Sequence, residues 1–149
     1  MEKALQEKLL ALQVKALESG NPPFAAIIVK DGKVLASEMN CSFGGRYPLS
    51  HAEMNAIQAA LTNHGVEVVK GAELLATNEP CPMCIGACIW SGIKLVRYYL
   101  GQQELFAIRG SGRFIAAREI ALQDSSDIQV IGPIGNEKML RNHEVFGLR

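Results

Sequence analysis

Hydrophobic residues change from helical to extended spacing along the first part of the chain. Residues 2–18 carry an apolar stripe at helical spacing, made of Leu5, Leu9, Leu12 and Ala16. Pro22-Pro23 ends the predicted helix, because proline cannot continue it. The apolar run 24–29 is rich in β-formers and predicts a buried strand. Asp31-Gly32 predicts a tight hairpin turn into a second strand over residues 34–37.

The rest of the chain alternates between helical and extended patterns. Helices are predicted over residues 51–63, 82–91, 113–121 and 136–146, and strands over 72–77, 93–100 and 128–131. Ser50 with Glu53 three residues later is a capping-box pattern, which predicts Ser50 as a helix N-cap. The alternation implies parallel strands with right-handed crossovers, and the leading hairpin makes the sheet mixed. We therefore expect an α/β fold, a three-layer α/β/α sandwich on a mixed, mostly parallel five-stranded sheet.

Composition bounds the class of protein. The 149 residues fit one domain, 1–149, and 48% hydrophobic residues suffice for a core. Fifteen basic and fifteen acidic side chains balance, which argues against a broad nucleic-acid surface. The charged N-terminus is unlike a signal peptide, and the sequence has no apolar run of membrane-spanning length. We expect a cytoplasmic protein with reduced thiols and no membrane contact.

Two short segments carry the candidate chemistry. Cys81 and Cys84 form a C-x-x-C pair at a helix start, where two thiolates can share one metal ion, and His51 can add a nitrogen. Three protein ligands leave the fourth position of a tetrahedral Zn²⁺ open for water, as in catalytic zinc sites. Glu53 lies two residues from His51 and can carry a proton from that water. Cys88 is a candidate fourth ligand, but a buried thiol packing as a small hydrophobe is the commoner arrangement.

The two segments together resemble a known signature. His-x-Glu at 51–53 followed by Pro-Cys-x-x-Cys at 80–84 is similar to the motif of zinc nucleobase deaminases. Residues 24–29 resemble the first strand of the cytidine/deoxycytidylate deaminase superfamily. Residues 79–87 are similar to the second motif of guanine deaminases and tRNA adenosine deaminases, and 89–93 lean towards guanine deaminases. The resemblance implies a cytidine-deaminase-like fold and one Zn²⁺ per chain.

The resemblance also implies a reaction and contacts for the substrate. The expected function is hydrolytic deamination of a small nucleobase-like substrate, an aminopurine such as guanine first, with release of ammonia. The resemblance is the only ground for expecting Asn40 to contact the base. The backbone amide of Ala52 is expected to help hold the base. Phe24 and Trp90 are equally compatible with stacking on the base and with core packing.

The resemblance extends to assembly and to the C-terminus. Because related deaminases pair near helix 82–91, we expect a homodimer. The helix after Gly135 is expected to act as a lid. His64 and His143 are expected to be solvated or to cap helices locally.

Other functions stay open at this point. A cytosine- or isocytosine-type pyrimidine deaminase uses the same motifs. A tRNA adenosine deaminase ranks lower, because phosphate contacts demand clustered basic residues. A non-catalytic module in which zinc only supports assembly does not need Glu53. The glycine-rich stretch 110–112 between Arg109 and Arg113 fits a phosphate cradle less well than a solvated loop.

Overall fold

The computed structural model describes residues 1–148. The helices are α1 (Glu2–Glu18), α2 (Ala52–His64), α3 (Val66–Val69), α4 (Pro82–Trp90), α5 (Gln102–Arg109), α6 (Ala117–Gln123) and α7 (Glu137–Gly147). The strands are β1 (Ala25–Lys30), β2 (Lys33–Met39), β3 (Glu73–Asn78), β4 (Leu95–Leu100) and β5 (Gln129–Ile131). No helix within residues 1–148 is long and apolar enough to cross a membrane.

One five-stranded mixed sheet, in the order β2-β1-β3-β4-β5, organises the chain. β1 pairs antiparallel with both β2 and β3, whereas the pairs β3·β4 and β4·β5 are parallel. The predicted hairpin turn is present, with positive φ at Asp31 (50°) and Gly32 (75°). The mixed sheet is thus confirmed, and its four pairings divide evenly between the two directions.

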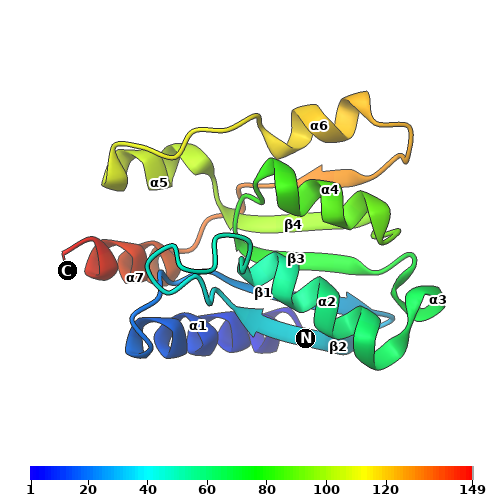
Figure 1. Cartoon of the computed structure of the whole chain (residues 1–149), viewed down its shortest axis with the longest axis horizontal. Coiled ribbons are helices and arrows are strands. Elements are labelled where there is room, and N and C mark those ends of the chain that lie inside the picture. The colour runs from blue at the N-terminus through cyan, green and yellow to red at the C-terminus, as the bar shows by residue number, and fades with distance from the viewer. Residues whose placement is uncertain (149) are drawn as a thin grey trace.

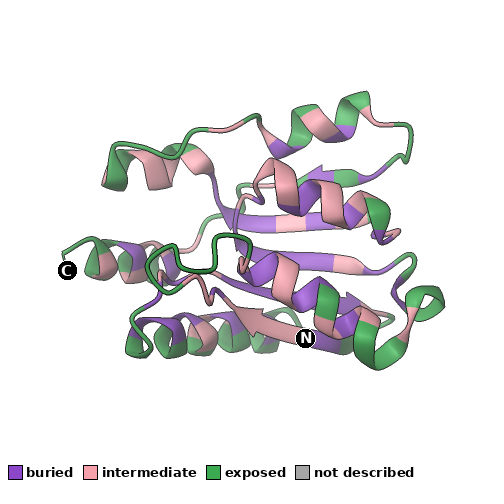
Figure 2. Cartoon of the chain, in the orientation of Figure 1, coloured by how far each residue is buried: buried purple, intermediate pink, exposed green. Residues whose placement is uncertain are grey.

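Helices cover both faces of the sheet (Figure 1). α2, α4 and α6 pack on one face against Ala26, Ile28, Leu74 and Val96, whereas α1 and α7 pack on the other face against Ile27 and Leu75. Successive strand residues point to opposite faces, so a strand buried on both sides reads as a continuous apolar run. Figure 2 shows the buried residues concentrated in the strands and on the inner sides of the helices. The predicted three-layer sandwich is confirmed.

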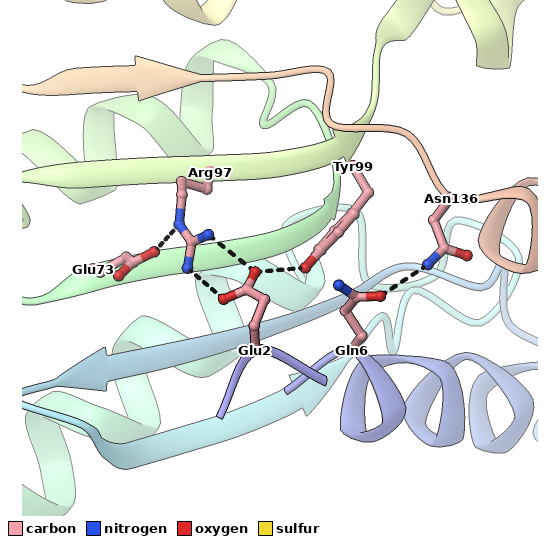
Figure 3. Close-up of polar contacts among 6 residues, drawn as sticks. All are labelled: Glu2, Gln6, Glu73, Arg97, Tyr99 and Asn136. Atoms are coloured by element: carbon pink, nitrogen blue, oxygen red, sulfur yellow. Dashed lines mark hydrogen bonds and ion pairs between the residues drawn. The ribbon is translucent and has the colours of Figure 1, made fainter. Parts of the chain in front are cut away.

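A group of polar contacts ties the ends of the chain to the sheet (Figure 3). The Glu2 carboxylate accepts hydrogen bonds from Arg97 at 3.0 and 3.3 Å and from the Tyr99 hydroxyl at 3.1 Å. Arg97 also pairs with Glu73 on the neighbouring strand. Asn136, the N-cap of α7, donates to Gln6 of α1 at 3.4 Å. These contacts fix the start of α1 and of α7 beside β4.

Three local predictions were wrong. The helix expected over 113–121 begins only at Ala117, and α5 before it was not predicted at all. α5 has no fully buried residue, and its eight residues are too few for a clear periodic pattern. Ser50 is not an N-cap: His51 holds that position without a side-chain cap bond, while the Ser50 hydroxyl contacts the Asn55 side chain.

Candidate active site

The N-termini of two helices converge at the ends of the strands. His51 is the N-cap of α2 and Cys81 is the N-cap of α4, and each has extended backbone dihedrals. Pro82 occupies the first position of α4, where its missing N–H is no loss, and Cys84 lies in the same first turn. A helix N-terminus favours negative charge, so thiolates are stabilised at this place.

The side chains at these helix starts form a compact donor group. Nδ1 of His51 lies 3.6 Å from the Sγ atoms of both Cys81 and Cys84, and the two sulfurs lie 3.7 Å apart. Zinc–sulfur bonds of about 2.3 Å and zinc–nitrogen bonds of about 2.0 Å at tetrahedral angles require nitrogen–sulfur separations of about 3.5 Å and a sulfur–sulfur separation of about 3.8 Å. The donor set and its spacing therefore fit one Zn²⁺ with a fourth position left open.

The protonation of these ligands favours a cation. The hydrogen bond from Cys84, with help from His51, lowers the pKa of Cys81 to about 4. The same bond, together with burial, raises the pKa of the Cys84 thiol well above its usual range. The proton shared by the two sulfurs therefore stays on Cys84, while Cys81 is a thiolate. A metal ion would displace this proton, since cysteine binds metals as thiolate.

The other two cysteines lie outside this group. Within residues 1–148 the cluster that could hold a metal contains His51, Cys81 and Cys84 and no fourth residue. Cys88 is fully buried among apolar side chains, and burial raises its pKa. Cys41 is half-buried, with its sulfur 3.6 Å from the carbonyl of Met39. Cys88 thus packs as a small hydrophobe, as its position on α4 suggested.

Glu53 lies in the first turn of α2, two residues after His51, and is 5% exposed. Burial raises the pKa of its carboxyl group to about 7, an effect that its own backbone N–H and His51 partly offset. A carboxyl group of this kind can both accept and return a proton near neutral pH. Its side chain takes no part in a cap bond for α2, so the capping role is not observed.

A cavity of about 340 Å³ opens beside this group. Among its lining residues are Phe24, Asn40, His51, Glu53 and Cys81. The structure therefore brings five of the eight sequence-predicted site residues to one cavity. Cys84 is fully buried and is not among the lining residues.

Two predicted contact residues are not among the lining residues. Ala52 is fully buried, and the contact expected from its backbone amide stays a prediction. Trp90 is 92% exposed at the end of α4 and also lies outside the lining. Stacking of Trp90 on a base within the same chain, one of its two expected roles, is incompatible with this position, and so is core packing.

Several lining residues were not predicted to border this site. They are Pro22, Ser42, Asn78, Glu79, Gly101, Gln102, Leu105, Arg109, Gly112 and Phe114. Asn78 and Glu79 lie between the end of the predicted strand and Pro80-Cys81, where functional side chains tend to gather, and this was the available signal. The segment 101–114 carried no such signal, because the helix within it was not predicted.

His143 corrects another expectation. It is 2% exposed rather than solvated, and its Nε2 atom lies 3.0 Å from Oδ1 of Asn78. Its ring meets Phe24 edge-on, with centroids 4.9 Å apart. α7 therefore supports the cavity from behind, whereas its role as a lid stays a prediction. Arg109 lies over the Phe24 ring at 5.6 Å, so it faces the cavity rather than a phosphate cradle.

An α/β/α sandwich with a His-Cys-Cys donor set at two helix N-termini, a buried carboxyl group and an adjoining cavity is the arrangement expected of zinc-dependent hydrolytic enzymes. Comparison with known proteins narrows this class. Residues 1–100 match the family described as the cytidine and deoxycytidylate deaminase zinc-binding region. The chain belongs to this family.

Individual relatives agree on the family and differ in substrate. Guanine deaminase of Bacillus subtilis is 41% identical over 76 residues, which cover 51% of this chain and 49% of the relative. tRNA-specific adenosine deaminase of Aquifex aeolicus is 39% identical over 82 residues, covering 55% and 54%. The chain thus spans about half the length of these two relatives. Guanine deaminase from Nitrosomonas europaea shares the fold, with a TM-score of 0.79 at 22% identity over 95% of this chain and 81% of that one.

Proposed function

We propose that this protein is a zinc-dependent hydrolytic deaminase of a small nucleobase-like substrate, with an aminopurine such as guanine as the first candidate. The observation that carries the proposal is the placement of Glu53 and the His51, Cys81 and Cys84 group beside one cavity. The cavity volume of about 340 Å³ suits a single heterocycle, being at the lower end of ordinary ligand sites.

In the proposed reaction, water replaces the exocyclic amine of the base and ammonia leaves. His51, Cys81 and Cys84 would hold a zinc ion, which would supply an acidified water molecule next to the cavity. Glu53 accepts one proton from this water while the oxygen of the water bonds to the ring carbon that bears the amine. The carboxyl group passes this proton to the adjacent ring nitrogen and then moves the second proton of the water to the departing amine, so that a carbonyl group and ammonia are formed. No proton or electron is gained or lost overall.

The proposal can be tested with a panel of bases. Zinc-loaded protein is incubated with guanine, cytosine, isocytosine, adenine, aminopterins, aminotriazines and a tRNA carrying a target adenosine, and ammonia release is measured. We expect turnover of guanine or a related aminopurine. Turnover of cytosine alone, or of tRNA alone, would replace the aminopurine with that substrate class. Zinc-loaded protein that releases ammonia from none of them would overturn the proposed activity.

We also propose a homodimer that buries the outer side of α4. Trp90 is 92% exposed there, and Leu122 on the adjacent α6 is 79% exposed. Exposed large apolar side chains mark interaction sites when they form one contiguous patch on the surface. Light scattering should give a mass near twice 16.2 kDa. Trp90→Glu should shift it to the monomer, whereas Val66→Glu, an exposed residue on α3, should not.

The proposed activity belongs to the cytoplasm. All four cysteines are free of disulfide bonds, and the thiolate chemistry of Cys81 and Cys84 needs a reducing environment. A disulfide between these two cysteines in protein isolated without reductant would show how readily oxidation competes with metal binding.

A further inference from the structure

Asn78 is a buried polar residue of the cavity wall that the proton transfer above does not use. It ends β3, is 5% exposed and lines the cavity. Its Oδ1 atom lies 2.7 Å from the Thr77 hydroxyl and 3.0 Å from Nε2 of His143. Its Nδ2 atom is buried and has no hydrogen-bond partner within residues 1–148. Buried donors are rarely left without a partner, so this one calls for a ligand.

The neighbours of Asn78 decide which amide atom is free. The Thr77 hydroxyl accepts a hydrogen bond from the backbone N–H of Ala25 at 3.0 Å. Its one proton has two acceptors within reach, the Ala25 carbonyl at 3.3 Å and Oδ1 of Asn78 at 2.7 Å, and the shorter distance favours Asn78. A neutral His143 protonated on Nε2 donates to the same oxygen. With both donors on the oxygen, the nitrogen is the polar atom of Asn78 that is left without a partner.

His143 is held in this role by its surroundings. It packs edge-on against Phe24, with centroids 4.9 Å apart and an interplanar angle of 70°. Burial, with a contribution from the Arg109 guanidinium, lowers the pKa of His143 to about 3. The imidazole is therefore neutral at physiological pH, and the tautomer that its contact with Asn78 requires sets the direction of the amide.

We propose that the side-chain N–H of Asn78 donates a hydrogen bond to the bound substrate, and that His143 is a positioning residue that keeps the amide turned this way. The inference rests on the proposed function and deepens it. The substrate must carry an acceptor opposite Asn78, either a carbonyl oxygen or an unprotonated ring nitrogen. A base without that acceptor leaves the donor unpaired and binds about tenfold more weakly or worse.

The test uses guanine and three analogues that each lack one acceptor: 2-aminopurine without O6, 3-deazaguanine without N3 and 7-deazaguanine without N7. Calorimetry gives the affinity of each for zinc-loaded protein, and every protein compared, including the one with the wild-type Asn78 and His143, carries Glu53→Gln so that no base is turned over during the measurement. Asn78→Asp keeps an acceptor for Thr77 and His143 but removes the donor. The matched control is Asn21→Asp, because Asn21 is also buried with an unpartnered Nδ2, accepts from the Phe43 N–H at 2.8 Å, and lies outside the cavity lining.

We expect Asn78→Asp to weaken guanine binding about tenfold or more, and Asn21→Asp to leave it unchanged. The analogue that lacks the acceptor for Asn78 should bind Asn78→Asp and the wild type equally well. An equal loss for all four compounds, or no loss, overturns the inference while leaving the proposed function intact. If the wild type binds no guanine, cytosine is compared with 4-aminopyrimidine, which lacks the oxygen. Failure of both bases to bind the wild type overturns this inference, whereas the proposed function is decided by ammonia release from the full panel.

Two substitutions at His143 test the positioning role. His143→Phe should reduce the preference for guanine over the critical analogue, because the amide can then turn. His143→Gln should retain the preference, because glutamine still offers a donor. Nitrogen-15 shifts of the wild type should show His143 protonated on Nε2. Protonation on Nδ1, or equal effects of both variants on the preference, overturns the assignment.

Discussion

Glu79 joins two helix N-termini to the strand end that carries the cavity. Its carboxylate accepts hydrogen bonds from the backbone N–H of Gln102 at 3.1 Å, from the Gln102 side chain at 3.2 Å and from the backbone N–H of Ala117 at 3.0 Å. Gln102 begins α5 and Ala117 begins α6, so one carboxylate meets the positive ends of both helices. α6 has no side-chain cap of its own, and α5 buries none of its residues.

Glu79→Ala removes all three hydrogen bonds. Bonds to a charged group contribute about 1.5–3 kcal/mol each when fully counted, but water replaces part of them at this half-buried place. We therefore expect a total loss of about 2–4 kcal/mol in the free energy of unfolding. Glu79→Gln keeps an amide oxygen and should lose about half as much. Because residues 101–114 border the cavity, the loosened segment should raise KM more than it lowers kcat.

Urea unfolding followed by circular dichroism measures the stability, and hydrogen exchange over 101–117 localises the effect. Glu104→Ala is the matched control, because Glu104 accepts one hydrogen bond, from the N–H of Gly101 at 3.0 Å, in the same helix start. It should cost about 1 kcal/mol or less. If Glu79→Ala destabilises the protein no more than Glu104→Ala, the double capping role is wrong. Zinc content must stay unchanged in both variants.

Three further predictions concern the metal, the proton and acidity. Cys84→Ser should lower zinc content and thermal stability together, since metal binding stabilises only the folded state; elemental analysis and a melting curve with and without chelator check this. Glu53→Gln should keep fold and zinc but lose turnover by two orders of magnitude or more, about 10²–10⁴-fold being typical for a proton-transfer group, and loss of the metal instead would make Glu53 a ligand. The pKa of His143 is lowered to about 3 in the folded protein, against about 6.5 in the unfolded chain. Between these two pH values the unfolded chain binds a proton that the folded protein does not, so the free energy of unfolding falls as the pH falls. The share of His143 in the free energy of unfolding should drop by about 2 kcal/mol between pH 7 and pH 5, and denaturant curves of His143→Gln should lack this share.

The metal group could be predicted from the sequence because its geometry is local. Cys81 and Cys84 are three residues apart at a helix start, so backbone geometry alone brings their sulfurs within 3.7 Å. His51 lies thirty residues earlier, yet it also opens a helix after a loop, and parallel strands with crossovers bring such helix starts to one edge of the sheet. Periodicity similarly predicted the apolar strands and the two helical layers, since both depend on which residues face a core.

The segment 101–117 could not be predicted because nothing local stabilises it strongly. No residue of α5 is fully buried. The start of α6 is determined by a hydrogen bond from Ala117 to Glu79, about forty residues earlier in the chain. Periodicity placed this helix at residue 113, whereas the capping hydrogen bond places it at Ala117. Tertiary hydrogen bonds of this kind override weak propensity and leave no trace in a local pattern. Trp90 was uncertain for a related reason, because an apolar residue on a helix does not reveal whether a core, a ligand or a second chain covers it.

The division between predictable and unpredictable residues follows the division between chemistry and selectivity. In the proposed reaction the donor group and Glu53 act on any ring carbon that bears an amine, and they need only short spacings along two helix starts. In the proposed function, choice of base depends on the cavity wall, where Asn78 comes from a strand end and Arg109 from a helix, and on His143 of the C-terminal helix, which contacts Asn78. Because His143 acts through Asn78 and not by direct contact, substitutions on α7 can change selectivity without touching the lining. Relatives that share the two motifs can therefore act on different bases, and the residue pair at positions 78 and 143 is the place to look for the difference.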